Sequence, residues 1–270
     1  TPGHEQYTRN MVTGASTADV TVILIDARQG ILTQTRRHSM ICSSLGIKNV
    51  VLAINKMDLV DYDQEVFDQI VSEYQSFSDE LTFETVTPIP MSALKGDNVV
   101  TRSQGTHWYS GPTLLGFLET VDTRALKVEH PLRFPVQWVN RPNLDFRGFS
   151  GTIEAGLASV GQSVRVLPSG ETASIKDIVL FEGSLESAEA GQAVTLTLDR
   201  EVDASRGDLI VAGDAPCEVS DQFEVNLVWM DQEPGYVGRS YQLKLGASTV
   251  NAQISQVKHK TNINTFEKLA

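Results

Sequence analysis

The feature that most constrains the fold is an alternation of strand-like and helix-like stretches in the first half of the chain. The strand-like stretches cover residues 20–26, 50–55 and 85–91. The helix-like stretches cover residues 33–45, 63–77 and 113–121. Strands that are apolar on both faces and alternate with helices are typical of a parallel sheet between helices. Residues 1–129 are therefore predicted to form an α/β domain.

After His130-Pro131 the sequence changes to short alternating stretches separated by turn residues. Six strands are expected before Ala215-Pro216, at residues 133–139, 149–154, 163–167, 172–181, 193–198 and 208–211. Three more are expected afterwards, at residues 223–229, 240–245 and 249–256. This pattern predicts an antiparallel β-barrel over residues 130–215 and the start of a second, truncated barrel over residues 216–270.

Charge and composition exclude several classes of partner. The 270 residues carry 22 Lys and Arg against 34 Asp and Glu, a net charge of −12, so a surface that attracts nucleic-acid phosphates is not expected. The apolar runs are far shorter than the ~20 residues of a membrane-spanning helix. Cys42 and Cys217 lack metal-site spacing, and no apolar leader opens the chain. We expect a cytoplasmic protein with no nucleic-acid or membrane partner.

The stretch Asn55-Lys56-Met57-Asp58 directly follows the second predicted strand. It is therefore expected at the carboxyl end of a parallel strand, where α/β proteins bind ligands. The carboxylate of Asp58 can accept from both N1–H and N2–H of guanine, a donor pair that adenine lacks. The Asn55 amide can address the acceptor edge, and the stem of Lys56 can lie along the base. Taken alone, the same four residues also suit a solvated turn.

Two further motifs favour the guanine interpretation. Ser92-Ala93-Leu94 follows the third predicted strand, where backbone N–H groups could reach guanine O6. Thr1-Pro2-Gly3-His4 precedes the first strand, and Gly3 would allow the backbone to approach a terminal phosphate closely. Each motif is weak alone, but their order and spacing agree.

In this order the three motifs resemble the switch II, base-specificity and final guanine motifs of the translation-factor GTPases. Longer runs resemble, more narrowly, the GTPase large subunits of bacterial sulfate adenylyltransferase; these runs are residues 1–11, 30–39, 90–99, 108–115 and 256–265. Elongation factor Tu differs at Glu5-Gln6 and at Arg36-Arg37-His38. The resemblance implies a P-loop GTPase domain followed by antiparallel barrels of translation-factor type.

The resemblance also implies a function. In that family a small catalytic subunit joins sulfate to ATP, giving adenosine 5′-phosphosulfate and pyrophosphate, and GTP hydrolysis in the large subunit drives the step. The ATP and sulfate chemistry would lie on the partner of a heterodimer. His4 would orient the attacking water. Thr1, Pro2 and Gly3 would lie at the phosphates, with Asn55, Lys56, Asp58 and the Ser92–Leu94 backbone at the base.

The phosphate-binding loop and the Mg²⁺ ligands of that family have no counterpart in this sequence. They are expected upstream of Thr1, which lies inside a motif, so the chain is interpreted as a truncated GTPase domain without its N-terminal phosphate loop. We expect GTP and Mg²⁺ as cofactors, with no metal ligand in this chain. The fragment alone is expected to be inactive.

Several alternatives stay open. An elongation factor of the elongation factor Tu type, which binds aminoacyl-tRNA, has the same motifs, and a nucleotide-free scaffold would lack the phosphate loop. Asp26 is more simply explained as a cap or turn residue than as a catalytic one. The run Arg36-Arg37-His38 is expected on a solvated helix face, and His107-Trp108-Tyr109 in aromatic packing of a loop.

Overall fold

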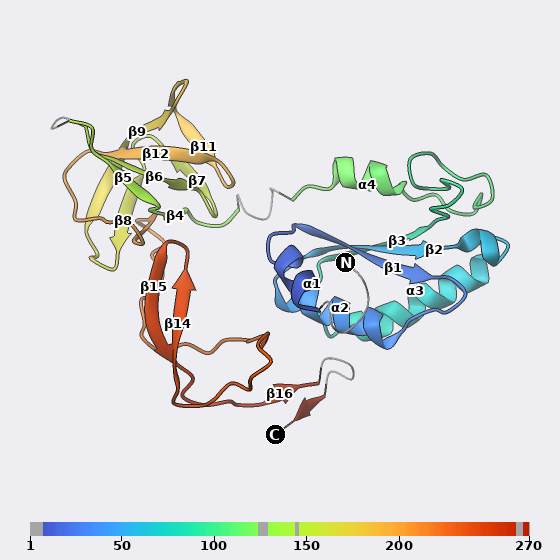
Figure 1. Ribbon diagram of the computed structural model, residues 1–270. Helices are drawn as coiled ribbons and strands as arrows, with labels where there is room; N and C mark the ends of the chain where they lie inside the picture. Colours follow the sequence, from blue (N-terminus) through green and yellow to red (C-terminus); the bar gives the residue numbers. More distant parts are fainter. Residues whose placement is uncertain (1–7, 124–128, 144–145, 263–266, 270) are drawn as a thin grey trace. The chain divides into compact units, whose positions relative to one another are not determined.

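The computed structural model describes residues 8–123, 129–143, 146–262 and 267–269 (Figure 1). The chain divides into two compact units. The first comprises Thr1–Val121, Asn226–Glu233 and Val257–Ala270, and the second comprises Asp122–Val225 and Pro234–Gln256. None of the described helices has the length and apolar character that crossing a bilayer requires.

The first unit contains a three-stranded sheet in the order β1 (Val20–Asp26), β2 (Asn49–Asn55) and β3 (Thr85–Pro90). Both pairings are parallel, as predicted, and the register sets Asp26 beside Asn55 and Ile54 beside Pro90. The carboxyl ends of the three strands therefore meet at one edge, and the segments that follow them start close together.

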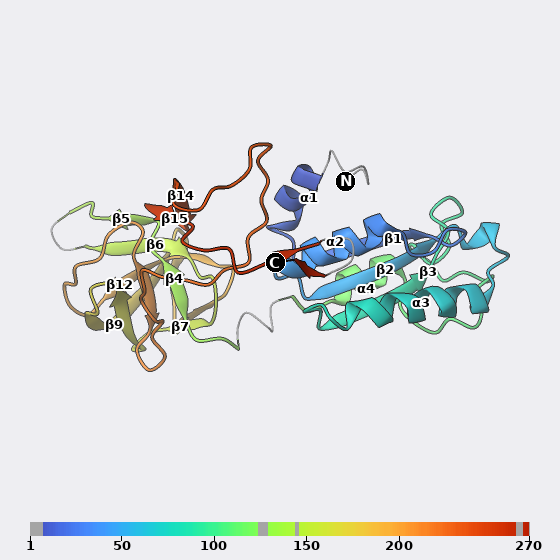
Figure 2. The ribbon, with the colours of Figure 1, turned by 90° about the horizontal axis from the view of Figure 1, so that it is seen from below.

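Helices cover the two faces of this sheet (Figures 1 and 2). The helices of the unit are α1 (Thr8–Ala15), α2 (Thr33–Ser44), α3 (Gln64–Ser78) and α4 (Leu114–Thr120). Leu52 packs on one face with Phe67 and Tyr74 of α3. Val51, one residue earlier, packs on the opposite face near Phe117 of α4. The three helices and three strands predicted for this region are confirmed to within one or two residues at each end.

Helix starts follow the local chemistry of the sequence. The side chain of Asp63 accepts a hydrogen bond from Glu65 N at 2.8 Å and caps α3. Thr113 caps α4 by accepting from Gly116 N at 3.1 Å. Coverage of the sheet is less complete than predicted, since Leu24 on the outer strand β1 is 63% exposed.

The second unit is built on an antiparallel sheet in the order β4-β13-β8-β9-β12-β6-β5, with β10 added beside β9. Its strands are β4 (Arg133–Pro135), β5 (Trp138–Asn140), β6 (Gly148–Thr152), β8 (Ser163–Leu167), β9 (Thr172–Leu180), β10 (Gly183–Leu185), β12 (Ala193–Leu198) and β13 (Leu209–Ala212). A separate pair joins β7 (Leu157–Ser159) to β11 (Ser187–Glu189). Alternate residues point inward, among them Phe134, Phe149 and Ile178.

One expected strand, at residues 133–139, is two strands. Val136 N donates to Asp208 O at 2.9 Å, whereas Gln137 N donates to Ser150 O at 2.8 Å. The chain therefore leaves β13 and joins β6 between two consecutive residues, which breaks the strand. The sequence pattern is continuous there, because alternation does not specify the neighbouring strand. The short strands β7, β10 and β11 were also not predicted.

The C-terminal part confirms two of its three expected strands. These are β14 (Ser240–Leu245) and β15 (Ser248–Gln253), which pair as an antiparallel hairpin. The prediction of a strand at residues 223–229 is wrong: that segment has no strand, and Val225 is 71% exposed. An alternating pattern alone does not make a strand, because a strand also needs a neighbouring strand with which it forms a ladder of backbone hydrogen bonds. The short strands β16 (Lys260–Thr261) and β17 (Lys268–Leu269) form a further antiparallel pair.

Candidate functional site

The segment after β2 turns sharply at the edge of the parallel sheet. Asn55 is the last residue of β2, and Lys56 has left-handed backbone angles, with φ 65°. Residues Met57–Leu59 form a short 3₁₀ helix. Met57 is fully buried, and its N–H donates to Met91 O at 3.1 Å. The turn is thus anchored by Met57, while Lys56 is exposed and Asp58 is half-buried.

The loop after β3 lies against this turn. Asn55 Oδ1 accepts a hydrogen bond from Ala93 N at 2.9 Å. Ser92 is completely buried, and its Oγ accepts from Lys95 N at 3.3 Å. Leu94, in contrast, is 90% exposed. The structure therefore brings together two motifs that are 38 residues apart in the sequence.

These contacts refine the expected roles of the two motifs. The Asn55 side-chain oxygen and the Ala93 N–H satisfy each other, so the amide group that Asn55 keeps for a ligand is its NH₂. The backbone of Ser92–Leu94 lies at the surface except for the buried Ser92. A planar ring with donors and acceptors on its edge could approach here from the solvent side.

Asp26, at the end of β1, was predicted to be a cap or turn residue, but its side chain also binds two cationic side chains. Its Oδ2 accepts from Lys56 Nζ at 2.8 Å and from Arg28 Nη2 at 2.6 Å. Its Oδ1 accepts from Arg28 N and Arg28 Nε, both at 3.0 Å. The Arg28 guanidinium, followed by the Lys56 ammonium, holds the pKa of the Asp26 carboxyl well below its usual range. The carboxylate stays charged and fixes the end of the Lys56 side chain.

A second pair of residues joins the two loops and was not predicted. The hydroxyl of Tyr62 donates to Oδ2 of Asp97, and Trp108 Nε1 donates to Tyr62 O at 3.1 Å. The predicted aromatic packing of the loop is confirmed, because the Trp108 ring centroid lies 5.1 Å from that of Phe67. Of the pair Tyr62 and Asp97, only Asp97 lies in one of the stretches that resemble the GTPase subunits, residues 90–99.

Asn98 forms a buried support beneath the second loop. Its Nδ2 donates to Pro90 O at 2.7 Å and to Thr106 Oγ1 at 2.8 Å. Its Oδ1 accepts from Ser103 N at 2.9 Å. Asn98 has φ 54°, a conformation that asparagine tolerates better than most residues. The amide thus ties the end of β3 to the following loop.

The basic run on α2 differs from its prediction. Arg37 is buried rather than solvated. The Arg36 guanidinium lies 4.7 Å from the centroid of the Phe77 ring and 3.4 Å from Glu73 Oε1. Burial lowers the pKa of His38. The prediction of a solvated basic face is therefore wrong for Arg37, since α2 packs this part of its surface against the protein.

Four predicted site residues, Thr1, Pro2, Gly3 and His4, lie outside the described residues. Among the residues that are described, no group of three His, Cys, Asp or Glu side chains is arranged to hold a metal ion. Cys42 is buried next to Thr21, and its environment raises the pKa of the thiol, as suits a core residue.

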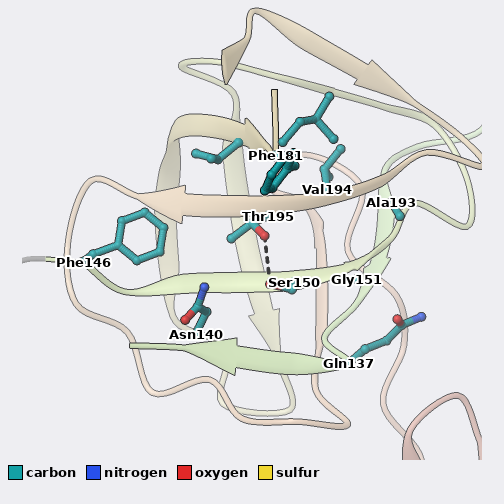
Figure 3. Close-up of a pocket in the computed structure, with 11 residues that line it drawn as sticks. Gln137, Asn140, Phe146, Ser150, Gly151, Phe181, Ala193, Val194 and Thr195 are labelled. Atoms are coloured by element: carbon teal, nitrogen blue, oxygen red, sulfur yellow. Dashed lines mark hydrogen bonds between the residues drawn. The ribbon is translucent and has the colours of Figure 1, made fainter. Parts of the chain in front are cut away.

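A cavity of about 420 Å³ lies in the second unit, on the antiparallel sheet (Figure 3). Its wall includes Gln137, Asn140, Phe146, Ser150, Phe181 and Thr195. Two of these residues, Ser150 and Thr195, share a hydrogen bond of 2.8 Å between Oγ and Oγ1. None of the lining residues carries a charge, so this cavity offers no cation for a polyphosphate. The edge of the parallel sheet is the better candidate for a nucleotide.

The chain is similar to known proteins over almost its whole length. Residues 1–128 match the family described as Elongation factor Tu GTP binding domain, and residues 222–270 match the GTP-eEF1A C-terminal domain-like family. Sulfate adenylyltransferase subunit 1 of Shewanella woodyi (strain ATCC 51908 / MS32) is 55% identical over 269 residues, which are 99% of this chain and 57% of the relative. The chain is a homologue of sulfate adenylyltransferase subunit 1.

Two other relatives show how far this homology extends. Subunit 1 of Vibrio cholerae serotype O1 (strain ATCC 39541 / Classical Ogawa 395 / O395) is 54% identical over 98% of this chain and 56% of the relative. The bifunctional enzyme NodQ of Rhizobium sp. (strain N33) is 55% identical over 98% of this chain and 41% of that enzyme. The chain thus spans about half the length of the curated relatives it matches. The activity of the whole protein is therefore proposed below.

Proposed function

We propose that this chain is part of a GTP-binding and GTP-hydrolysing regulatory subunit of sulfate adenylyltransferase. The whole protein would couple GTP hydrolysis to the reaction of ATP with sulfate, which yields adenosine 5′-phosphosulfate and pyrophosphate. The ATP and sulfate would bind to a small catalytic subunit, the partner in a heterodimer. Homology to subunit 1 over the whole chain supports this proposal.

The proposal that this chain binds a guanine nucleotide rests mainly on the hydrogen bond from Ala93 N to Asn55 Oδ1, which is 2.9 Å long. It joins the turn that bears Asp58 to the loop that bears Ser92–Leu94. A guanine base between them would donate N1–H and N2–H to the Asp58 carboxylate and direct O6 toward the loop backbone. Rejection of adenine follows, because adenine would leave the Asp58 carboxylate without these donors.

The remaining site residues extend the proposal toward the phosphates. Thr1, Pro2 and Gly3 would approach the terminal phosphate, and His4 would orient the attacking water. Mg²⁺ is part of the proposal because it neutralises the phosphates of a bound nucleotide, but no residue of this chain is assigned to it. Lys56 would lay its aliphatic stem against the base while Asp26 holds its ammonium.

The proposal also covers the domain organisation. It assigns residues 1–129 to the GTPase domain, 130–215 to a β-barrel and 216–270 to the start of a second barrel. Barrel closure of the middle part is supported by the two terminal strands of its sheet order, β4 and β5. These strands are separated in sequence by only Val136 and Gln137, which brings the ends of the sheet near each other.

An elongation factor that carries aminoacyl-tRNA is the alternative. The match to an elongation factor Tu GTP-binding family is compatible with it. The net charge of −12 opposes a large nucleic-acid partner, and 53–55% identity to subunit 1 favours sulfate adenylyltransferase.

The test uses the natural full-length protein, purified together with its small subunit. Pyrophosphate release from ATP is measured with and without sulfate, and with GTP, a non-hydrolysable GTP analogue or no added nucleotide. We expect strong stimulation only when sulfate and hydrolysable GTP are both present. Release that does not respond to GTP, or a protein that binds aminoacyl-tRNA instead, would overturn the proposal.

A further inference from the structure

The hydrogen bond between Tyr62 and Asp97 connects the two loops that surround the candidate base site. Tyr62 lies four residues after Asp58, and Asp97 lies three residues after Leu94. The Tyr62 hydroxyl donates to Oδ2 of Asp97. The backbones of Asp97 and Ser92 form two hydrogen bonds. Ser92 N donates to Asp97 O at 3.2 Å, and Asp97 N donates to Ser92 O at 3.1 Å.

Hydrogen bonds hold both the backbone N–H and the backbone carbonyl of Tyr62. Its N–H donates to Met57 O at 2.9 Å, and its carbonyl accepts from Trp108 Nε1 at 3.1 Å. Asp61 and Tyr62 both have left-handed φ angles, 52° and 53°. Two consecutive residues other than glycine in this region are unfavourable and persist only where the surroundings hold them. The chain thus accepts local strain to direct Tyr62 toward the second loop.

The ring of Tyr62, which is half-buried, also lies against neighbouring residues. A Cβ atom added to Gly105 would come within 2.8 Å of the ring, so this position suits glycine. Lys95, from the second loop, places its Nζ 5.6 Å from the ring centroid on Tyr62. The tyrosine therefore contacts the second loop through its hydroxyl and through its ring.

Burial and the neighbouring carboxylates of Asp97 and Asp58 raise the pKa of Tyr62 to about 12. The phenol therefore stays protonated and remains a donor at neutral pH.

We propose that Tyr62 is a positioning residue for guanine recognition. Its hydrogen bond to Asp97 sets the separation between the Asp58 carboxylate and the backbone of Ser92–Leu94, so that both edges of the base can be bound at once. The inference rests on the proposed function, since it assumes that guanine lies between the loops. Tyr62 itself need not contact the nucleotide.

A simpler role for Tyr62 is core packing, and Tyr109 provides the matched comparison. The Tyr109 hydroxyl also donates within the first unit, to Pro88 O at 3.1 Å and Pro112 O at 3.0 Å. Pro88 lies in β3 and Pro112 lies two residues before α4, so Tyr109 does not join the two loops. Removing either hydroxyl deletes the same chemical group.

The experiment compares Tyr62→Phe with Tyr109→Phe in the full-length protein. Dissociation constants are measured for GTP and for ITP, which lacks the 2-amino group that Asp58 would accept from. We expect Tyr62→Phe to lower the preference for GTP over ITP about five- to tenfold, the size of one hydrogen bond's net contribution. Tyr109→Phe should leave this preference unchanged. If Tyr62 had a purely structural role, Tyr62→Phe would weaken the binding of GTP and of ITP equally and would lower the melting temperature.

Two further variants complete the test. Asp97→Asn keeps an acceptor oxygen for Tyr62 and should retain most of the GTP preference, whereas Asp97→Ala should match Tyr62→Phe. The double variant Tyr62→Phe with Asp97→Ala should be no worse than either single change, because both remove the same interaction. An unchanged GTP to ITP ratio in folded Tyr62→Phe protein overturns this inference. If the unaltered protein itself does not prefer GTP to ITP, the proposed function fails instead.

Discussion

The Asp26 carboxylate and the Lys56 ammonium lie 2.8 Å apart and join the end of β1 to the turn after β2. The parallel register sets Asp26 beside Asn55, so the next residue, Lys56, has to bend back to reach it. Left-handed backbone angles at Lys56 achieve this. Arg28 contacts the same carboxylate through its Nε and Nη2 atoms. The arrangement fixes both ends of the Lys56 side chain. In the proposed function, the stem between them would lie along the guanine base.

Changing Asp26 to Asn should therefore weaken nucleotide binding modestly. The variant keeps an acceptor for Arg28 N but loses the charge that holds Lys56. Because the Lys56 side chain is 46% exposed, the ion pair is screened by solvent, and we expect only a few-fold loss of GTP affinity in the full-length protein. Titration with a fluorescent GTP analogue at low and high salt measures this loss of affinity. Asp68→Asn, on the exposed face of α3, is the control, and equal losses in the two variants would contradict the role of Asp26.

The Asp26 carboxylate also predicts how stability depends on pH, because Arg28 and then Lys56 favour its charged form. The folded-state pKa of Asp26 lies below its usual value of 3.8, so the ionised carboxylate stabilises the folded state at pH values above 3.8. This contribution is lost as the pH falls below 3.8 and the folded-state carboxyl takes up its proton. The stability difference between unaltered protein and Asp26→Asn, from urea unfolding, should be constant from about pH 5 to pH 8 and should shrink in stronger acid. A difference that varies near pH 7 would point to another group.

Asp58→Asn tests guanine recognition in the full-length protein. The substitution replaces an acceptor oxygen by an NH₂ donor, which would then face the amino group of guanine. Xanthine carries an oxygen at that position, so specificity should move from GTP to XTP. We expect about a hundredfold loss of GTP affinity, or about 3 kcal/mol. Competition between GTP and XTP measures the change. A variant that still prefers GTP would remove the main support for a guanine site.

Asn98→Ala should destabilise the first unit. It removes the hydrogen bonds to Pro90 O, Thr106 Oγ1 and Ser103 N, and it leaves these partners unsatisfied in a buried region. It also places alanine at φ 54°. We expect a cost of about 3–5 kcal/mol in the free energy of unfolding, measured by urea denaturation. Asn251→Ala, in the exposed hairpin strand β15, should cost less than about 0.5 kcal/mol.

His4→Ala tests the proposed position of the attacking water. If His4 acts mainly in the transition state, GTP turnover in the full-length protein should fall by about a hundredfold or more, while GTP affinity stays nearly unchanged. Single-turnover hydrolysis and equilibrium binding separate the two effects. A parallel loss of binding and turnover would instead indicate a structural role for His4.

The sequence alone determined strands β1, β2 and β3 and helices α2, α3 and α4 of the first unit. It also predicted a site at the ends of β2 and β3. Buried strands and amphipathic helices have strong periodic signals, so β1, α3 and β3 were predicted nearly to the residue. Because parallel strands align their carboxyl ends, the motifs after β2 and β3 could be expected together before their contacts were known. The hydrogen bond from Ala93 N to Asn55 Oδ1 shows that the two motifs are in contact.

Tertiary structure decided the contacts that depend on which segments become neighbours. The alternating segment at residues 223–229 is not a strand, since alternation cannot supply a hydrogen-bonding partner. Burial of Arg37 and the split of strand 133–139 likewise depend on packing and on strand order. The pairs Asp26–Lys56 and Tyr62–Asp97 join residues 30 and 35 positions apart. No local pattern encodes such pairs, because side-chain contact across a sheet edge is set by strand register and loop geometry.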